Sequence, residues 1–426
     1  VAHHVDFAAP VQVPARLTAV LRPYQHDGYL WLSRLAAAGL GSCLADDMGL
    51  GKTLQLIAGY SLLAARADAF AARPWNGVVL DEAQAIKNRK SQISRALREL
   101  QADAMIAMSG TPVENRLMDY WSVMDFVNPG LLGSAERFGK EFAKPIESSR
   151  DPVKAEQFRR VTAPFIMRRL KSDRSIIRDL PAKLTVDRYC ALTPVQAALY
   201  EAQVRHSLSV IEAVEKKSFV RQSIILNLMR QLKMICNSPE QYSNEDPHRG
   251  PQYSGKTQVL FDLLDELLEA RRKTLIFTQF VHTGELLQQW IGEHTGQRPQ
   301  FLHGGLSRSQ RGEIVDKFQS DRSERCLILS LKAAGTGLNL TAASAVIHYD
   351  LWWNPAVEDQ ATDRAHRIGQ KKVVYVMKMI ASNTIEEKVL DLQRRKQAVI
   401  SATVSTTDAA VMEKLSVEDL DRLLSS

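Results

Sequence analysis

A glycine-rich turn between an apolar segment and an apolar helix pattern constrains the fold of this chain more than any other feature. The turn is DDMGLGKT at 46–53; it follows the apolar segment 42–45 and precedes the leucine-rich stretch 54–63. Two glycines let backbone N–H groups face an anion, and the following helix N-terminus adds positive potential. The turn therefore predicts a phosphate-binding loop, in which Lys52 reaches the outer phosphates and Thr53 ligates magnesium.

The loop departs from the general pattern G-x-x-x-x-G-K-[ST] at its first position, where Asp46 stands instead of glycine. A glycine turn without a ligand is the alternative interpretation. If the loop binds a nucleotide, the predicted contacts are Asp47, Met48, Gly49, Leu50, Gly51, Lys52 and Thr53.

Two carboxylates at the end of the next apolar strand fit the same chemistry. Residues 78–80 are apolar, and Asp81 and Glu82 follow directly. Asp81 would hold magnesium through water, whereas Glu82 would orient or activate the attacking water. Upstream, the side-chain amide of Gln25 carries the donor and the acceptor needed to bind an adenine edge, although its segment also fits a plain amphipathic helix. Residues 105–112 predict another buried strand, which ends in a Ser-Gly-Thr-Pro turn.

The spacing between the loop and the carboxylates is short. Only 27 residues, 54–80, separate Thr53 from Asp81, and a helix after the loop would use most of them. An α/β lobe that carries both a phosphate loop and carboxylates at a strand end places a further strand and helix between them, because parallel strands need crossover connections. We therefore expect that a segment is missing near 73–75.

Composition bounds the function. The 426 residues allow two or three domains, and 45% hydrophobic with 24% charged residues is typical of globular proteins. A net charge of +7 is compatible with a polyanionic partner.

The four cysteines lie far apart, which predicts a reducing compartment and neither disulfides nor a structural metal. No apolar run reaches the roughly 18 residues of a membrane helix, and no signal peptide is apparent. The first residue is Val1, so we expect a fragment.

The second half of the chain reads as another α/β lobe without a phosphate loop. Strand-like segments at 274–280, 300–303, 326–331, 345–350 and 373–380 alternate with helical patterns, which indicates a parallel sheet covered by helices. Gln360, Arg364 and Arg367 have a spacing that would place them on one helix face. Such arginines can stabilise a phosphoryl transition state held by another lobe, and the alternative is a basic surface helix.

Taken together, these segments resemble the Swi/Snf-type ATPases of helicase superfamily two. The matching motifs, in family order, are LRPYQ (21–25), DDMGLGKT (46–53), DEAQ (81–84), SGTPVEN (109–115), FIMRRLKSD (165–173), LIFTQF (275–280), LHGGLSRSQR (302–311), AAGTGLNLT (333–341) and WWNPAVEDQATDRAHRIGQ (352–370). Asp46 is what this family has at that position. The chain departs from the family in lacking the lobe-one motifs between the loop and DEAQ, and in carrying Gln84 and Ala334 where some relatives have His and Gly.

The resemblance implies an α/β protein of two RecA-like parallel-sheet lobes in tandem, each with a helical protrusion. The expected boundaries are lobe 1 at 1–120, protrusion 1 with a basic return segment at 121–186, crossover and protrusion 2 at 187–253, lobe 2 at 254–400 and a helical tail at 401–426. Gly335, Gly337 and Gln360 join the expected nucleotide contacts. Nucleic-acid contacts are expected at Arg168, Arg169, Lys171, His303, Lys332 and Asn339.

The implied function is a motor that uses ATP and Mg²⁺ to move along double-stranded DNA and remodel DNA-bound proteins. Lys52, Glu82, Arg364 and Arg367 would carry the chemistry. The alternatives are a strand-separating helicase, an RNA-directed motor, or a non-hydrolysing nucleic-acid-binding scaffold if lobe 1 truly lacks a segment. The expected location is the bacterial cytoplasm, at the nucleoid, or the nucleus if the source is eukaryotic.

Overall fold

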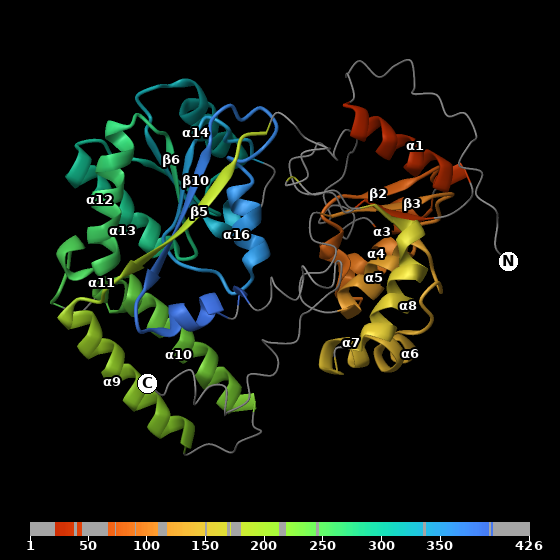
Figure 1. The fold of residues 1–426 in the computed structure, drawn as a ribbon, viewed down its shortest axis with the longest axis horizontal. Coiled ribbons are helices and arrows are strands. Elements are labelled where there is room, and N and C mark those ends of the chain that lie inside the picture. Colours follow the sequence, from red (N-terminus) through yellow and green to blue (C-terminus); the bar gives the residue numbers. More distant parts are fainter. Residues whose placement is uncertain are drawn as a thin grey trace. The chain divides into compact units, whose positions relative to one another are not determined.

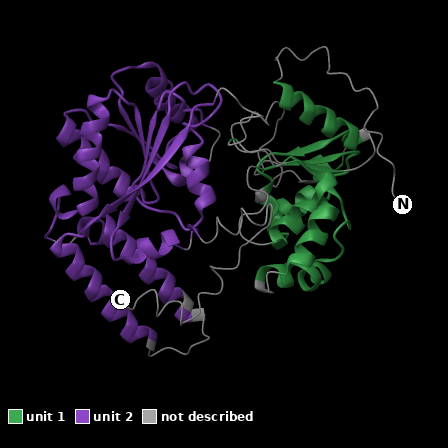
Figure 2. Ribbon diagram, in the orientation of Figure 1, with its two compact units in different colours: residues 1–179, 398–412 green, residues 180–397, 413–426 purple. Residues whose placement is uncertain are grey.

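The computed structural model divides the chain into two compact units, which Figure 2 distinguishes by colour. Unit 1 comprises 1–179 and 398–412, and unit 2 comprises 180–397 and 413–426. The structure describes residues 22–37, 41–44, 67–72, 74–89, 91–109, 117–149, 151–167, 171, 180–212, 219–243, 247–334, 338–391 and 393–394. Each unit is built on its own parallel sheet, as the sequence predicted.

The sheet of unit 1 has the strand order β2-β3-β1-β4. Its strands are β1 (Ser42–Leu44), β2 (Val78–Leu80), β3 (Met105–Met108) and β4 (Ile166–Met167), all parallel. The described helices are α1 (Pro23–Ala37), α3 (Ala67–Ala71), the 3-10 helix η1 (Ala83–Ile86), α4 (Gln92–Arg98), α5 (Leu117–Val127), α6 (Ala135–Phe138), the π-helical turn η2 (Gly139–Ala143), α7 (Lys144–Ser149), α8 (Pro152–Thr162) and the 3-10 turn η3 (Ala163–Phe165).

In the sheet, β3 lies between β1 and β2, so these two strands are joined by a crossover connection. It spans residues 45–77, more than the roughly dozen residues that a crossover between parallel strands requires. Trp75 ties its end to the sheet: its N–H donates to Gln101 O at 3.0 Å, and its carbonyl accepts from Asp103 N at 3.0 Å. The Trp75 indole also donates to Phe70 O at 2.9 Å. Within the described residues, the sheet of unit 1 therefore has four strands, and the expectation that a segment is missing near 73–75 stays a prediction.

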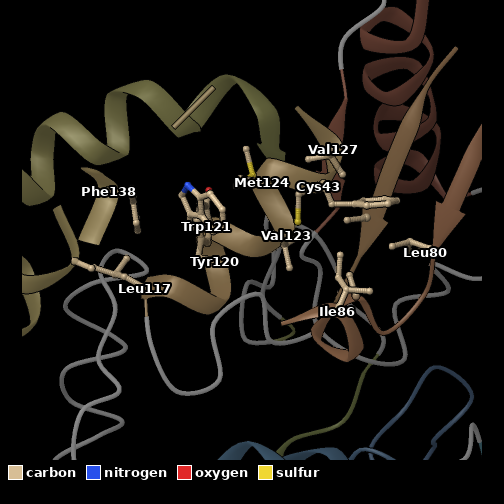
Figure 3. Packing of buried hydrophobic residues seen from close by; sticks show 14 of the residues in the cluster. Cys43, Leu80, Ile86, Leu117, Tyr120, Trp121, Val123, Met124, Val127 and Phe138 are labelled. Atoms are coloured by element: carbon tan, nitrogen blue, oxygen red, sulfur yellow. The ribbon is translucent and has the colours of Figure 1, made fainter. Parts of the chain in front are cut away.

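Helix α5 packs against β1 and forms much of the unit 1 core. Figure 3 shows Cys43 of β1 among Val123, Met124 and Val127 of α5, and all four are buried. Two hydrogen bonds fix the chain just before β1, because the Asn128 side chain accepts from Gly41 N at 2.8 Å and donates to Gly41 O at 2.9 Å. A Cβ at Gly41 would lie 1.8 Å from Val127 O, so only glycine fits there.

The sheet of unit 2 has the strand order β5-β10-β9-β6-β8-β7. Its parallel strands are β5 (Lys183–Cys190), β6 (Thr274–Thr278), β7 (Gln300–Leu302), β8 (Cys326–Ser330), β9 (Ala345–His348) and β10 (Val374–Ala381). The five strand-like segments expected in this half correspond to β6–β10. The boundary expected between 186 and 187 falls inside β5, an edge strand that is mostly exposed and rich in polar residues. A search for alternating apolar and polar residues does not detect this strand, because most of its residues are exposed on both sides.

Helices cover both faces of this sheet (Figure 1). α12 (Gly255–Glu269) and α13 (Val281–Thr295) pack on the side chains of Ile276, Ile328 and Ile347. α14 (Arg308–Ser320) and α16 (Pro355–Thr362) pack on the opposite face, against the alternate residues of the same strands. This alternation is the expected signature of strands buried on both sides.

A helical hairpin adjoins the unit 2 sheet. It consists of α9 (Pro194–Glu212) and α10 (Phe219–Asn237), followed by α11 (Pro239–Tyr242) and the 3-10 turn η4 (Pro251–Tyr253). α9 begins with Pro194 at its first position, and Ser254 caps α12 by accepting from Thr257 N. Short α15 (Leu331–Ala334) follows β8. Across the described segments, no helix has both the length and the apolar character needed to cross a membrane.

A buried ion pair joins α12 to the segment after β10. Lys256 Nζ lies 2.6 Å from Glu386 Oε1, with side-chain exposures of 1% and 0%. Burial disfavours the ammonium, but Glu386 and the other nearby acidic groups, among them Asp350, together outweigh this effect, so the pKa of Lys256 is raised. Glu386 also accepts from Ala381 N at 2.9 Å, which fixes the end of β10.

We predict that Lys256→Met lowers the free energy of unfolding by about 3–5 kcal/mol, because it leaves the Glu386 carboxylate buried without its counter-charge. Urea denaturation of the full chain measures this. The matched control is Lys140→Met, which breaks the Lys140–Glu136 pair whose side chains are 76% and 80% exposed. Equal effects of the two substitutions would contradict the assigned role of Lys256.

Candidate nucleotide site

The strands of unit 1 bring the end of β1, which precedes the predicted phosphate loop in the sequence, and the carboxylates to one edge of the sheet. Leu44 is paired with Met108, and Leu80 with Ala107, so the three strands end almost level. Ser109 N donates to Leu44 O at 3.1 Å, which places the residue after β3 beside the last residue of β1. The carboxyl edge of a parallel sheet is where α/β proteins bind ligands.

The phosphate loop leaves this edge directly after β1. Its residues Asp47, Met48, Gly49, Leu50, Gly51, Lys52 and Thr53 lie outside the described residues. What the structure fixes is the point from which the loop starts.

Asp81 and Glu82 follow β2 at the same edge, and both are half-buried. The Asp81 carboxylate accepts from Glu82 N at 2.9 Å. Glu82 has a φ of 51°, in the left-handed region that non-glycine residues rarely adopt, and η1 starts immediately afterwards. Such local strain is often found at functional positions. Carboxylate oxygens at a partly accessible position also suit Mg²⁺, which prefers oxygen ligands.

Gln25 lies in the first turn of α1 and is half-buried. Its Oε1 accepts from Arg22 N at 3.0 Å, a local contact at the helix start. The expected contact with an adenine therefore stays a prediction.

The arginine cluster of unit 2 differs from the expected helix. α16 ends at Thr362, so it carries Gln360, while Arg364 and Arg367 follow in a non-helical turn. The prediction that one helix face presents all three residues was wrong. The physical reason is that the backbone bonds elsewhere: the Arg364 carbonyl accepts from Leu340 N at 2.9 Å.

That contact brings together two motifs that the sequence identified separately. Arg367 Nη1 donates to Leu338 O at 3.5 Å. The Gln370 amide donates to Thr341 O and Ala343 O at 3.0 and 2.7 Å. The 338–343 segment and the 364–370 turn therefore form one polar cluster. Within it the Arg364 side chain is 3% exposed, whereas Arg367 is half-buried.

The expected nucleic-acid contacts are only partly described. His303 is half-buried, and its Nδ1 accepts from Gly305 N at 3.2 Å. Lys332 and Asn339 are exposed, and Lys171 is half-buried. The remaining residues expected to contact nucleic acid or nucleotide in this part of the chain, Arg168, Arg169, Gly335 and Gly337, lie outside the described residues.

The sequence missed a buried polar network around Asp350. Asp350 follows β9, and its carboxylate accepts from Thr278 Oγ1 at 2.5 Å and from Gln279 N at 2.9 Å. Lys233 of α10 is likewise buried, with its Nζ donating to Leu351 O. A lysine within the apolar pattern of α10 and an aspartate at a strand end were the available signals.

Comparison with known proteins decides the family. The model of the SNF2-related domain matches residues 24–63 and 56–241, and that of the helicase conserved C-terminal domain matches 255–369. The chain belongs to the SNF2-related family.

Individual relatives agree with this assignment. The putative ATP-dependent helicase/translocase YwqA of Bacillus subtilis is 36% identical over 479 residues, covering 97% of this chain and 51% of the relative. The human TATA-binding protein-associated factor 172 is 29% identical over 535 residues, covering 94% of this chain and 29% of that protein. The chain thus spans about half of the first relative and less of the second.

A solved structure supports the architecture. The SWI2/SNF2 ATPase core domain of Sulfolobus solfataricus is 35% identical, and the match covers 97% of this chain and 96% of that chain with a TM-score of 0.50. Units 1 and 2 are accordingly the two RecA-like lobes of an SNF2-related core.

Proposed function

We propose that this chain is an Mg²⁺-dependent ATPase, stimulated by double-stranded DNA, that moves along the duplex without separating its strands. The observation that carries the proposal is the carboxyl edge of the unit 1 sheet, where Asp81, Glu82 and Ser109 meet the strand that leads into DDMGLGKT. The membership of the SNF2-related family supports the same reading.

Each residue then has a distinct role at the nucleotide. Lys52 would neutralise the outer phosphates, Thr53 would ligate Mg²⁺ and Asp81 would hold it through water. Glu82 orients the attacking water as a general base. Bound Mg²⁺ supplies charge neutralisation between the phosphate oxygens. Gln25 would recognise the adenine edge, and the loop residues 47–51 contribute backbone N–H groups to the phosphates.

The arginines of unit 2 complete the site in this proposal. Arg364 and Arg367 are the candidate sources of guanidinium charge for the γ-phosphate in the transition state, and Gln360, Gly335 and Gly337 would line the nucleotide. Because Arg364 is 3% exposed and Arg367 is half-buried, we assign the direct phosphate contact to Arg367. Buried Arg364 then stabilises the 364–370 turn, in which its carbonyl accepts from Leu340 N.

DNA binding would rely on backbone contacts. Exposed Lys332 and Asn339, together with His303 and the basic segment containing Arg168, Arg169 and Lys171, are suited to phosphate contacts that carry no sequence information. The likeness to TATA-binding protein-associated factor 172 favours a DNA-bound protein as the target. The likeness to a Bacillus subtilis protein favours action in the bacterial cytoplasm, at the nucleoid.

We also propose that lobe 1 has lost an internal segment relative to its family. The family match is broken at 56–63, and the alignment with YwqA extends over 479 residues although this chain has 426. The lost stretch lies between the phosphate loop and DEAQ. This observation favours the non-hydrolysing DNA-binding scaffold as the second candidate function.

We predict that duplex DNA stimulates phosphate release from ATP, whereas single-stranded DNA and RNA stimulate it weakly. The measurement compares these three nucleic acids with a sample that contains none. Equal stimulation by RNA would indicate an RNA-directed motor. Duplex binding with no phosphate release under any condition would support the scaffold and contradict the motor.

We predict that Arg367→Ala lowers DNA-stimulated turnover by about a thousandfold, because the guanidinium acts mainly in the transition state. Glu82→Gln should lower turnover by about a hundredfold or more through loss of the base. Lys52→Ala should instead impair nucleotide binding, which calorimetry measures with a non-hydrolysable ATP analogue.

The matched control is Arg322→Ala, which removes an exposed arginine from the same lobe. It should keep the parental turnover. Parental turnover in Arg367→Ala would show that the arginine assignment is wrong.

A further inference from the structure

The loop that connects β9 to α16, residues 349–354, is held by two buried lysines; we refer to it as the exit loop. Lys256 Nζ donates to Tyr349 O at 3.1 Å, and Lys233 Nζ donates to Leu351 O. Between these two carbonyls, the Asp350 carboxylate accepts from Thr278, Gln279 and Asn237. Both ammonium groups and the carboxylate are fully buried, so water cannot replace these contacts.

The two lysines differ in how their charge is balanced. Lys256 has a carboxylate at 2.6 Å, in Glu386, whereas the direct hydrogen bond of Lys233 goes to a neutral carbonyl. Burial lowers the pKa of Lys233, and the Asp350 and Glu386 carboxylates oppose that shift. The ammonium also lies 4.9 Å from the Trp353 ring centroid, a cation–π contact with the same loop. The Lys233 ammonium therefore makes both of these contacts, the hydrogen bond and the cation–π contact, with residues of the exit loop.

The exit loop is connected to the turn that carries Arg364 and Arg367 by helix α16 alone. Asn354 caps α16 by accepting from Ala356 N at 3.1 Å. Trp352 N donates to Glu358 Oε1 at 2.7 Å, and Glu358 pairs with Lys378 of β10 at 2.7 Å. α16 is eight residues long, so only about two helical turns separate the exit loop from the turn that carries Arg364 and Arg367.

We propose that Lys233 is a positioning residue through which the α9–α10 hairpin sets the exit loop and hence the arginines used in ATP hydrolysis. The proposal rests on the function proposed above, because it assigns Lys233 to that reaction. Lys233 is 1% exposed, so we assign it no direct contact with the nucleotide. Asn237 and the apolar side chains of α10 also contact the exit loop, and the proposal concerns the Lys233 contact alone.

The first test measures position without requiring catalysis. Lys233→Met keeps the length of the side chain and removes the ammonium. Hydrogen–deuterium exchange of the full chain should show that amides in 352–367 exchange about tenfold faster, while those of β6 stay protected. Arg230→Met, on an exposed position of α10, is the control and should leave the pattern unchanged. Unchanged exchange in Lys233→Met overturns the proposal.

The second test measures the reaction. At saturating ATP and duplex DNA, Lys233→Met should lower kcat by about tenfold to a hundredfold, with KM for ATP within about twofold. Lys233→Arg, which keeps the charge and the donor, should recover most of that loss. In an Arg367→Ala background, Lys233→Met should cost little more, because both changes act on the same step.

Full additivity of the two substitutions, or a loss confined to KM, overturns the proposal. If Lys233→Met does not fold, Lys233→Gln takes its place in both tests, since its amide can still donate. If the parent protein releases no phosphate, the proposed function fails, and the exchange measurement alone decides whether Lys233 positions the loop.

Discussion

The parallel strands of unit 1 impose the constraint on which the rest of the structure depends. Parallel strands end at a common edge, so residues far apart in the chain must converge there once the registers are set. The pairing of Leu44 with Met108 and the bond from Ser109 N to Leu44 O set that register. The strained Glu82 and Ser109 lie at this edge, and the predicted phosphate loop follows in the sequence from the strand that ends there. At the other end of β1, Gly41 is hydrogen-bonded to Asn128, and the close approach of Val127 leaves no room for a larger residue at Gly41.

In unit 2, the corresponding constraint concerns the turn at 364–370, which carries Arg364 and Arg367. Its carboxyl edge carries buried lysines and carboxylates instead of a phosphate loop, and these groups compensate one another inside the lobe. Buried ion pairs contribute little net stability compared with apolar packing, but they fix geometry where they are fully bonded. This fits a lobe whose proposed task is to present Arg367 at a defined position.

The sequence predicted the parts of the fold that depend on local pattern. Apolar runs located β1–β3 and β6–β10. It failed for β5, whose exposed polar residues make sense only beside β10, and for the helix expected through Arg367. Contacts such as Lys233 to Leu351 join residues 118 positions apart, and no periodicity encodes them. The short interval before DEAQ was visible in the sequence; the family match is interrupted at 56–63, within that interval but not at the expected 73–75.

Translocation along an intact duplex is the central claim, and displacement of a triplex-forming oligonucleotide tests it most directly. A labelled third strand is annealed to one end of a linear duplex, and its release is followed with the full chain, Mg²⁺ and ATP. The account predicts that release requires ATP hydrolysis and that the two strands of the duplex stay paired. Release that proceeds equally without ATP, or ATP hydrolysis without any release, would contradict it.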